Sequence, residues 1–309
     1  MGSINFDVVT GSVIVGLLVG LTGAGGGALM TPMLILLFGI KPSTAISSDL
    51  VATVLMRPFG AAVHLRRGTV HKPMVGWMAL GSVPAAFLGA FLLHQMSNAK
   101  GATANVERAL GAALLLGASA MLVRYIIDRR SANPRTGTLD SVRVRPVATV
   151  AIGIVGGLVV GLTSVGSGSL LIVMLMFLYP SLSASRMVGT DLTQAIPLTM
   201  AAAAGAMIFG HVEIPLTVSI AVGAVPAVLV GSLLSSRVGD RLLRPAIFLV
   251  ILASGLKYAG LGTDALAASV GVAFVVVVVE MVRTSRRPAA RSTDVAERRP
   301  VRVGAPSPT

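Results

Sequence analysis

The chain has no cysteine and few charged residues, and both shortages limit what it can be. Without cysteine it has no disulfides, no thiolate nucleophiles and no cysteine-bound metals. Charged residues make up 12% of the 309 residues, whereas soluble domains carry about a quarter. Hydrophobic residues make up 54%, and the mean hydropathy is +0.86. Because lipid solvates apolar side chains, this composition predicts an all-α integral membrane protein.

Aromatic residues are also scarce, at 4%, and basic residues outnumber acidic ones, which leaves a net charge of +13. The arginines gather in short stretches between apolar runs and near the C-terminus, not on a face interleaved with aromatic residues. Nucleic-acid binding is therefore not expected. The excess of Lys and Arg on the cytoplasmic side of membrane proteins accounts for the charge. No cleavable signal peptide is expected, because the first ten residues have no positive charge.

Apolar runs long enough to cross a bilayer, about 20 residues, recur along the chain. Seven single spans are predicted, at about 44–65, 73–96, 106–125, 187–210, 214–236, 242–260 and 264–282. Two longer uncharged runs, 8–40 and 146–185, are each interrupted by a Gly-rich break. Each half of these runs is expected to be too short to span. We therefore predict a re-entrant hairpin of two half-helices for each run, with one kinked span as the alternative.

The chain contains an internal duplication. GLLVGLTGAGGGALMTPM at 16–33 aligns with GLVVGLTSVGSGSLLIVM at 157–174, and ten of the 18 positions are identical. Further on, Asp49 aligns with Asp191, and GSVPAAFLGAFL at 81–92 aligns with GAVPAVLVGSLL at 223–234. The predicted parts are a first membrane repeat at 1–128, a basic linker at 129–145, a second repeat at 146–262, an additional span at 263–283 and a disordered basic tail at 284–309.

Charge predicts the orientation of the two repeats. The loop 64–73 carries three Lys or Arg residues, whereas the equivalent loop 206–215 carries none. The linker, the loop 235–244 and the tail are also basic. Placing the basic segments in the cytoplasm makes the repeats inverted, with the N-terminus outside. Parallel repeats with kinked spans are the alternative.

The two Gly-rich breaks are the candidate substrate site. A helix interrupted in lipid exposes backbone N–H groups, and the start of the next half-helix carries partial positive charge that suits an anion. The alternative role for the glycines is close helix packing, which we assign to the GxxxG pairs Gly16/Gly20 and Gly157/Gly161. The predicted substrate-binding residues of the breaks are Thr22, Gly25, Gly26, Gly27, Thr163, Gly166, Ser167 and Gly168.

Among the charged residues of the predicted spans we single out three, because charge inside a membrane is costly and usually functional. Arg57 is predicted to bind the substrate, and the alternatives are an ion pair with Asp49 or a side chain that reaches the interface. Asp49 and Asp191 are predicted either to couple transport to a proton or cation, or to cap helix starts and hold the hairpins. The four histidines lie near span ends without metal-ligand spacing, so no metal site is expected.

Several of these motifs together resemble the TauE/SafE sulfite exporter family. They are GLxxGLTGxGGG, the stretches SSDL and GTDL, RRGTVHKP and GSVPAAFLGA, and the resemblance runs over about residues 10–260. It implies membrane transport of sulfur-containing anions such as sulfite, sulfonates and organosulfur acids. The second half departs from the family pattern, since Ser167 replaces a glycine of the GxGGG run.

The sequence thus predicts a secondary transporter of a small anion in the cell membrane, with export as the favoured direction and alternating access at the two breaks. No Walker A motif is present, so ATP hydrolysis and cofactors are not expected. An anion channel is the alternative. An intramembrane serine hydrolase is disfavoured, because the second half offers only His211, at a predicted loop, to activate a serine of VGSGS. Homo-oligomerisation is left open.

Overall fold

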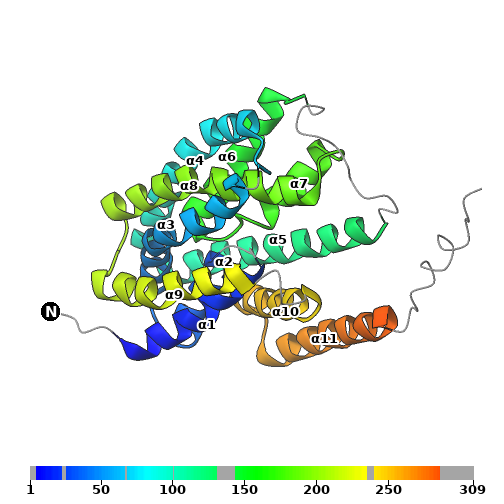
Figure 1. Ribbon diagram of the computed structural model, residues 1–309. Coiled ribbons are helices and arrows are strands. Elements are labelled where there is room, and N and C mark those ends of the chain that lie inside the picture. Colours follow the sequence, from blue (N-terminus) through cyan, green and yellow to red (C-terminus); the bar gives the residue numbers. More distant parts are fainter. Residues whose placement is uncertain are drawn as a thin grey trace, which may run out of the picture.

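The computed structural model describes residues 5–22, 26–66, 68–99, 101–130, 143–234 and 240–285, and nearly all of them are helical. Figure 1 labels the helices along the chain. They are α1 (Phe6–Thr22), α2 (Gly27–Leu36), α3 (Pro42–Arg66), α4 (Lys72–Asn98), α5 (Ala102–Arg130), α6 (Pro146–Thr163), α7 (Leu170–Leu178), α8 (Ala184–Phe209), α9 (Ile214–Leu234), α10 (Asp240–Tyr258) and α11 (Thr263–Ser285). Among the described residues, α3, α4, α5, α6, α8 and α9 are long and apolar enough to cross a membrane. The predicted all-α membrane protein is confirmed.

The two Gly-broken runs each consist of a long and a short helix. The prediction that both halves are too short to span is wrong for α6, whose 18 residues extend about 27 Å, close to the thickness of the hydrocarbon core. The other long half, α1, has 17 residues. The short halves, α2 and α7, have 10 and 9 residues. The re-entrant path of these hairpins stays a prediction.

Each long half packs against a helix from the other half of the chain: α1 lies along α9, and α6 lies along α4. Glycine makes this approach possible. A Cβ on Gly16 would lie 2.8 Å from the carbonyl oxygen of Ala224, and a Cβ on Gly157 would lie 2.4 Å from that of Ser82. These two contacts occupy equivalent positions in the aligned repeats. The packing role predicted for the GxxxG pairs is confirmed.

Matched hydrogen bonds join α3 and α8, which lie side by side (Figure 1). The Glu213 backbone N–H donates to Ser48 Oγ over 3.2 Å, and the His71 backbone N–H donates to Thr190 Oγ1 over 3.1 Å. Residues 48 and 190 are equivalent, as are 71 and 213. Because the start of each helix meets the end of the other, the two equivalent helices run antiparallel.

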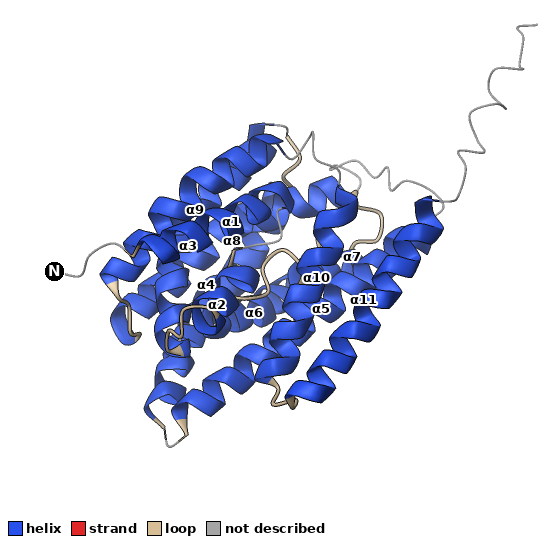
Figure 2. Cartoon of the chain, turned by 90° about the horizontal axis from the view of Figure 1, so that it is seen from below, coloured by secondary structure: helices blue, strands red, loops and turns tan. Residues whose placement is uncertain are grey.

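Two apolar clusters form the core, and each surrounds one of the short helices. One cluster includes Met30 and Leu34 of α2, and the other includes Leu171 and Leu175 of α7. The outer faces of the long helices expose large apolar side chains, which suit contact with lipid. Figure 2 shows α10 and α11 at one side of the bundle, where α10 packs against α5 and α11 packs against α10. Against this apolar packing, the interior also holds the buried charged side chains of Asp49, Arg57 and Asp191.

Candidate functional site

The two breaks meet inside the bundle. Gly27 begins α2 and Ser164 directly follows α6. A Cβ on Gly27 would lie 1.8 Å from the carbonyl oxygen of Ser164, so the backbones are in contact and no side chain fits between them. The approach of the two breaks, predicted from the sequence, is present in the structure.

The break between α6 and α7 has an unusual backbone. Ser164, Gly166 and Gly168 have φ values of 61°, 114° and 96°, a region that glycine adopts readily and other residues rarely do. The Thr163 hydroxyl stabilises the end of α6, since it donates to the Val159 carbonyl over 2.6 Å. These dihedrals turn the chain away from the axis of α6 and place Ser164 against the other break.

Asp49 holds the two breaks together. Its carboxylate is fully buried, and its Oδ2 accepts hydrogen bonds from Thr31 Oγ1 at 2.9 Å and from Ser164 Oγ at 2.8 Å. Its Oδ1 accepts a longer bond, 3.3 Å, from Thr53 Oγ1. The carboxylate therefore links α2, α3 and the second break. Asp49 and Asp191 lie about two turns inside their helices, so the alternative that they cap helix starts is wrong, whereas its other part, hydrogen bonds that hold the hairpins, is present for Asp49.

Arg57 lies two turns beyond Asp49 on α3, and its side chain is 5% exposed. Its Nη2 donates to Ser167 Oγ of the second break. Its Nη1 is buried and has no hydrogen-bond partner within the described part of the chain. The side chain does not reach the interface. It presents an unpaired cationic donor to the interior of the protein.

Asp191 of α8 has a different environment. It is fully buried, and neither carboxylate oxygen accepts a hydrogen bond that meets normal geometry from a described residue. The positive charge of Arg57 attracts the Asp191 carboxylate, and the backbone N–H of Gly168, in the second break, points a weaker donor toward it. Asp49, Arg57 and Asp191 together form a charged cluster at the junction of the two breaks.

The structure gathers most of the predicted site residues but not all. Thr22 donates its hydroxyl to the Leu18 carbonyl at 2.7 Å, which stabilises the end of α1. Gly166 packs against Val159 of its own hairpin. Gly25 lies outside the described residues. The predicted residues found at or beside the junction are Gly26, Gly27, Asp49, Arg57, Thr163, Ser167, Gly168 and Asp191.

Sequence reasoning missed several polar residues of this cluster. Thr31 and Ser164 bind Asp49 from other segments, and only a three-dimensional structure could reveal them. Thr53 could have been found, because it lies four residues after Asp49 and shares its helix face. Gln194 is fully buried on α8, where its Nε2 donates to Ser82 Oγ at 2.5 Å and its Oε1 has no described partner.

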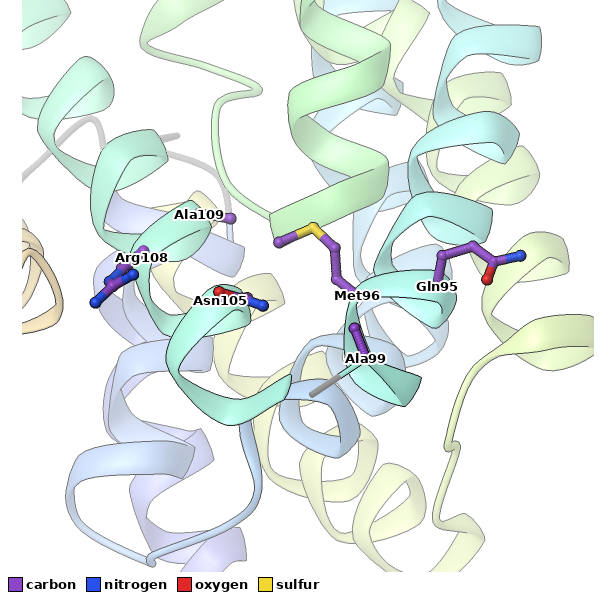
Figure 3. A pocket seen from close by; sticks show the side chains of 6 residues that line it. All are labelled: Gln95, Met96, Ala99, Asn105, Arg108 and Ala109. Atoms are coloured by element: carbon purple, nitrogen blue, oxygen red, sulfur yellow. The ribbon is translucent and has the colours of Figure 1, made fainter. Parts of the chain in front are cut away.

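The surface depressions lie away from this cluster. Figure 3 shows one between α4 and α5, where Gln95 and Arg108 point away from each other. A cavity of about 670 Å³ lies at the end of the bundle between the α2–α3, α4–α5 and α8–α9 connections. Neither includes Asp49, Arg57 or Asp191, and the burial of these three side chains closes the charged cluster to solvent in this conformation. Among the described residues, no group of three His, Asp or Glu side chains could hold a metal ion.

Helices of spanning length around a buried polar junction define a multi-span membrane protein. The family model "Sulfite exporter TauE/SafE" matches residues 8–258, and the chain belongs to this family of membrane transporters. The chain is 39% identical over 252 residues to "Probable membrane transporter protein YjnA" of Bacillus subtilis (strain 168), covering 81% of this chain and 98% of that one. It is 29% identical over 251 residues to "Probable membrane transporter protein YdhB" of the same organism, covering 79% and 95%. No solved structure matches.

Proposed function

We propose that this protein is a secondary transporter of a small sulfur-containing anion, such as sulfite, a sulfonate or another organosulfur anion, in the cell membrane. The observation that carries the proposal is the buried Nη1 of Arg57, which has no hydrogen-bond partner among the described residues where the two breaks meet. A buried cationic donor without an acceptor is costly. A bound oxyanion relieves that cost, and the family implies a sulfur anion.

The junction supplies donors suited to an oxyanion. Arg57 can offer two N–H groups to a sulfonate or sulfite, as guanidinium groups do with other planar or tetrahedral anions. Ser167 sits beside Arg57, and the amides of Gly27 and Gly168 belong to the same breaks. Several neutral donors around one cation allow an anion to lose its water without an unpaired charge.

Two features support alternating access: the charged cluster is buried, and the two repeats make matched contacts. The equivalent helices α3 and α8 run antiparallel, as inverted repeats in a membrane do. The cluster is buried, which favours a carrier over an open channel. Ser167 accepts a hydrogen bond from Arg57, and among the described residues no histidine is placed to take its proton, which opposes the serine hydrolase alternative. Export remains the favoured direction.

The test is uptake by purified protein in proteoliposomes, with a panel of sulfite, sulfate, thiosulfate, sulfoacetate and taurine. We expect at least one sulfur anion to be carried with saturable kinetics, and protein-free vesicles give the background. Flux that rises linearly with concentration would favour the channel. Failure to carry any member of the panel would reject the proposed substrate class.

The inverted orientation is tested by a matched pair of cysteines, since the chain has no native cysteine. Lys72 and Ile214 are equivalent, exposed residues in the first turns of α4 and α9. We expect an impermeant thiol reagent to label Ile214→Cys in intact cells and Lys72→Cys only after permeabilisation. A cysteine at Ser292 should behave like Lys72→Cys, because the tail is proposed to be cytoplasmic. Labelling of both α4 and α9 positions from the same side would establish parallel repeats.

A further inference from the structure

We propose that Asp191 carries a proton together with the anion, so that the protein is a proton–anion cotransporter. This inference rests on the proposed function and names the ion that is coupled to it. Asp191 is fully buried, and both of its oxygens lack a proper hydrogen-bond donor among the described residues. A carboxylate in that position is poorly compensated as an anion, whereas a neutral carboxyl is tolerated.

The charges of the cluster explain why the proton and the anion should bind together. Asp49 and Asp191 carry one negative charge each and Arg57 carries one positive charge, so the empty cluster has a net charge of −1. An added anion would raise the negative charge in an environment of low dielectric constant. A proton on Asp191 removes one negative charge and releases Arg57 from its attraction to that carboxylate. Binding of each ligand therefore strengthens binding of the other, as linkage requires.

Asp49 does not suit the proton-carrying role. Its carboxylate accepts from the hydroxyls of Thr31, Thr53 and Ser164, and each of these bonds favours the charged form. Protonation of Asp49 would disturb the bonds that hold the two breaks together. The two aspartates are equivalent in the duplication, yet only Asp191 can change charge without breaking hydrogen bonds of the described residues.

The groups around Asp191 are compatible with a single proton. On α3 it faces Arg57 and, beyond it, Asp49, and His64 in the last turn of α3 lies against Gly189, two residues before Asp191. On α5, Arg124 acts on it at longer range, but Arg124 also pairs with Asp128 at 3.8 Å, so this pair adds no net charge. The helices α6 and α7 contain no ionisable side chain, and those of α4, Lys72 and His94, lie near its ends. Arg57 is thus the main counter-charge that protonation releases.

The cycle balances in protons and charge. With the site open to one side, the Asp191 carboxylate takes a proton from water and Arg57 binds the anion. With the site open to the other side, the anion leaves Arg57 and the proton leaves Asp191, which restores the attraction between the two side chains. One proton and one anion move in the same direction in each turnover, so export proceeds only when the outward anion gradient exceeds the inward proton gradient.

The experiment uses full-length protein in proteoliposomes with thiosulfate and sulfoacetate, which stay ionised near neutral pH and so cannot carry a proton themselves. The membrane potential is clamped with potassium and valinomycin, and a trapped dye reports internal pH. We expect an inward anion gradient to acidify the wild-type vesicles. A gradient of one pH unit should drive about tenfold accumulation of the anion, the ratio set by one coupled proton.

The decisive variant is Asp191→Asn, which imitates the protonated side chain. It is expected to exchange internal for external anion yet to lose proton movement and pH-driven accumulation. Asp264→Asn is the matched control, because Asp264 is exposed on α11, far along the chain from the cluster, and should keep full coupling. If Asp191→Asn shows no exchange, Asp191→Glu must still couple protons to anion movement.

Each other outcome rejects the inference. Wild-type anion transport without proton movement would overturn it whatever the variants do, and so would coupling that persists in Asp191→Asn. Accumulation driven by a sodium gradient in wild type and lost in Asp191→Asn would assign the carboxylate to sodium instead. Failure of wild type to carry any anion of the panel would reject the proposed function, which is a separate result.

Discussion

The two halves of the molecule place one aspartate each at the same position, and the two side chains have different surroundings. Asp49 accepts three hydroxyl hydrogen bonds, and Asp191 accepts none of normal geometry from the described residues. The aligned residues explain the difference. Where the first half has Thr31 and Thr53, the second half has Ile172 and Ala195.

The same comparison applies to the cation. Arg57 aligns with Thr199, whose hydroxyl donates to the Ala195 carbonyl of its own helix at 2.8 Å. The duplication therefore explains where the carboxylates lie, and later divergence of their neighbours explains their chemistry. One half provides Arg57 and a hydrogen-bonded carboxylate, and the other half provides a carboxylate that accepts no hydrogen bond of normal geometry from the described residues.

The largest effect is expected at the contact between the halves. Gly27→Ala would place a methyl group 1.8 Å from the Ser164 carbonyl oxygen, so the two breaks would have to separate. Overpacking of this kind costs about 1–3 kcal/mol or more, and separation would also break the bond from Ser164 to Asp49. We expect no transport and a lower melting temperature in detergent, measured by uptake and by fluorescence-detected size exclusion.

The control for this variant is the adjacent glycine. A Cβ on Gly26 would lie 3.6 Å from Met56 and from Thr53 Oγ1, which is ordinary contact. Gly26→Ala should therefore transport. Equal activity of Gly27→Ala and Gly26→Ala would show that the close contact of the breaks is not needed for function.

The next largest effect is a difference in stability between the asparagine variants of the two aspartates. Asp49→Asn replaces an acceptor of charged hydrogen bonds with a group that cannot accept all of them, and hydrogen bonds to charged groups contribute about 1.5–3 kcal/mol each. Asp191→Asn removes a poorly compensated buried charge, so we expect unchanged or increased stability. Thermal unfolding in detergent at neutral pH measures both. Similar losses in the two variants would contradict the comparison drawn from the hydrogen bonds.

Much of this arrangement could be predicted from the sequence, because its causes are local or repeated. Apolar run length predicts the helices, and the alignment predicts the matched breaks and carboxylates. The packing role of Gly16 and Gly157 followed from their spacing alone. The break of the second run does lie near its middle, but the helices fill the two sides unequally: α6 occupies the whole first side and reaches 18 residues, whereas α7 ends at Leu178 after 9.

Two of the three partners of Asp49, Thr31 and Ser164, could not be predicted, because they come from other segments of the chain. Ser164 binds across 115 positions of the chain, and its equivalent in the first half is Gly23, which has no side chain to suggest the bond. The bond from Arg57 to Ser167 also joins different halves, and Ser167 was predicted as a ligand of the substrate without this partner. Contacts of this kind depend on tertiary packing and leave no periodic signal in the sequence.

A smaller effect is expected when the cation is changed. Arg57→Ala removes the unpaired donor and should weaken apparent anion affinity by about 1.5–3 kcal/mol, the scale of a charged hydrogen bond. Arg57→Lys keeps the charge but loses the second donor, so it should retain part of the affinity. Concentration dependence of uptake, normalised to protein in the vesicle, gives the values. Unchanged affinity in Arg57→Ala would assign the residue to an ion pair.

The smallest effect is expected from the weakest bond of Asp49. Thr53 Oγ1 lies 3.3 Å from Oδ1, whereas Thr31 lies 2.9 Å from Oδ2. Thr53→Val keeps the volume and makes the first half resemble the second, where Ala195 is apolar. We expect a loss of about 0.5–1 kcal/mol in stability, compared with about 1.5 kcal/mol or more for Thr31→Val.

Thr193→Val is the matched control for this pair, since the Thr193 hydroxyl donates to the Gly189 carbonyl of its own helix and does not bind either aspartate. Thermal unfolding should rank Thr31→Val below Thr53→Val, with Thr193→Val closest to wild type. The ranking of the three melting temperatures is a stricter test than the size of each change. The ranking follows from which atom each hydroxyl binds and from the length of that bond. If all three variants melt together, the hydroxyls do not hold the Asp49 carboxylate, and the contrast with Asp191 would have to come from Arg57 alone.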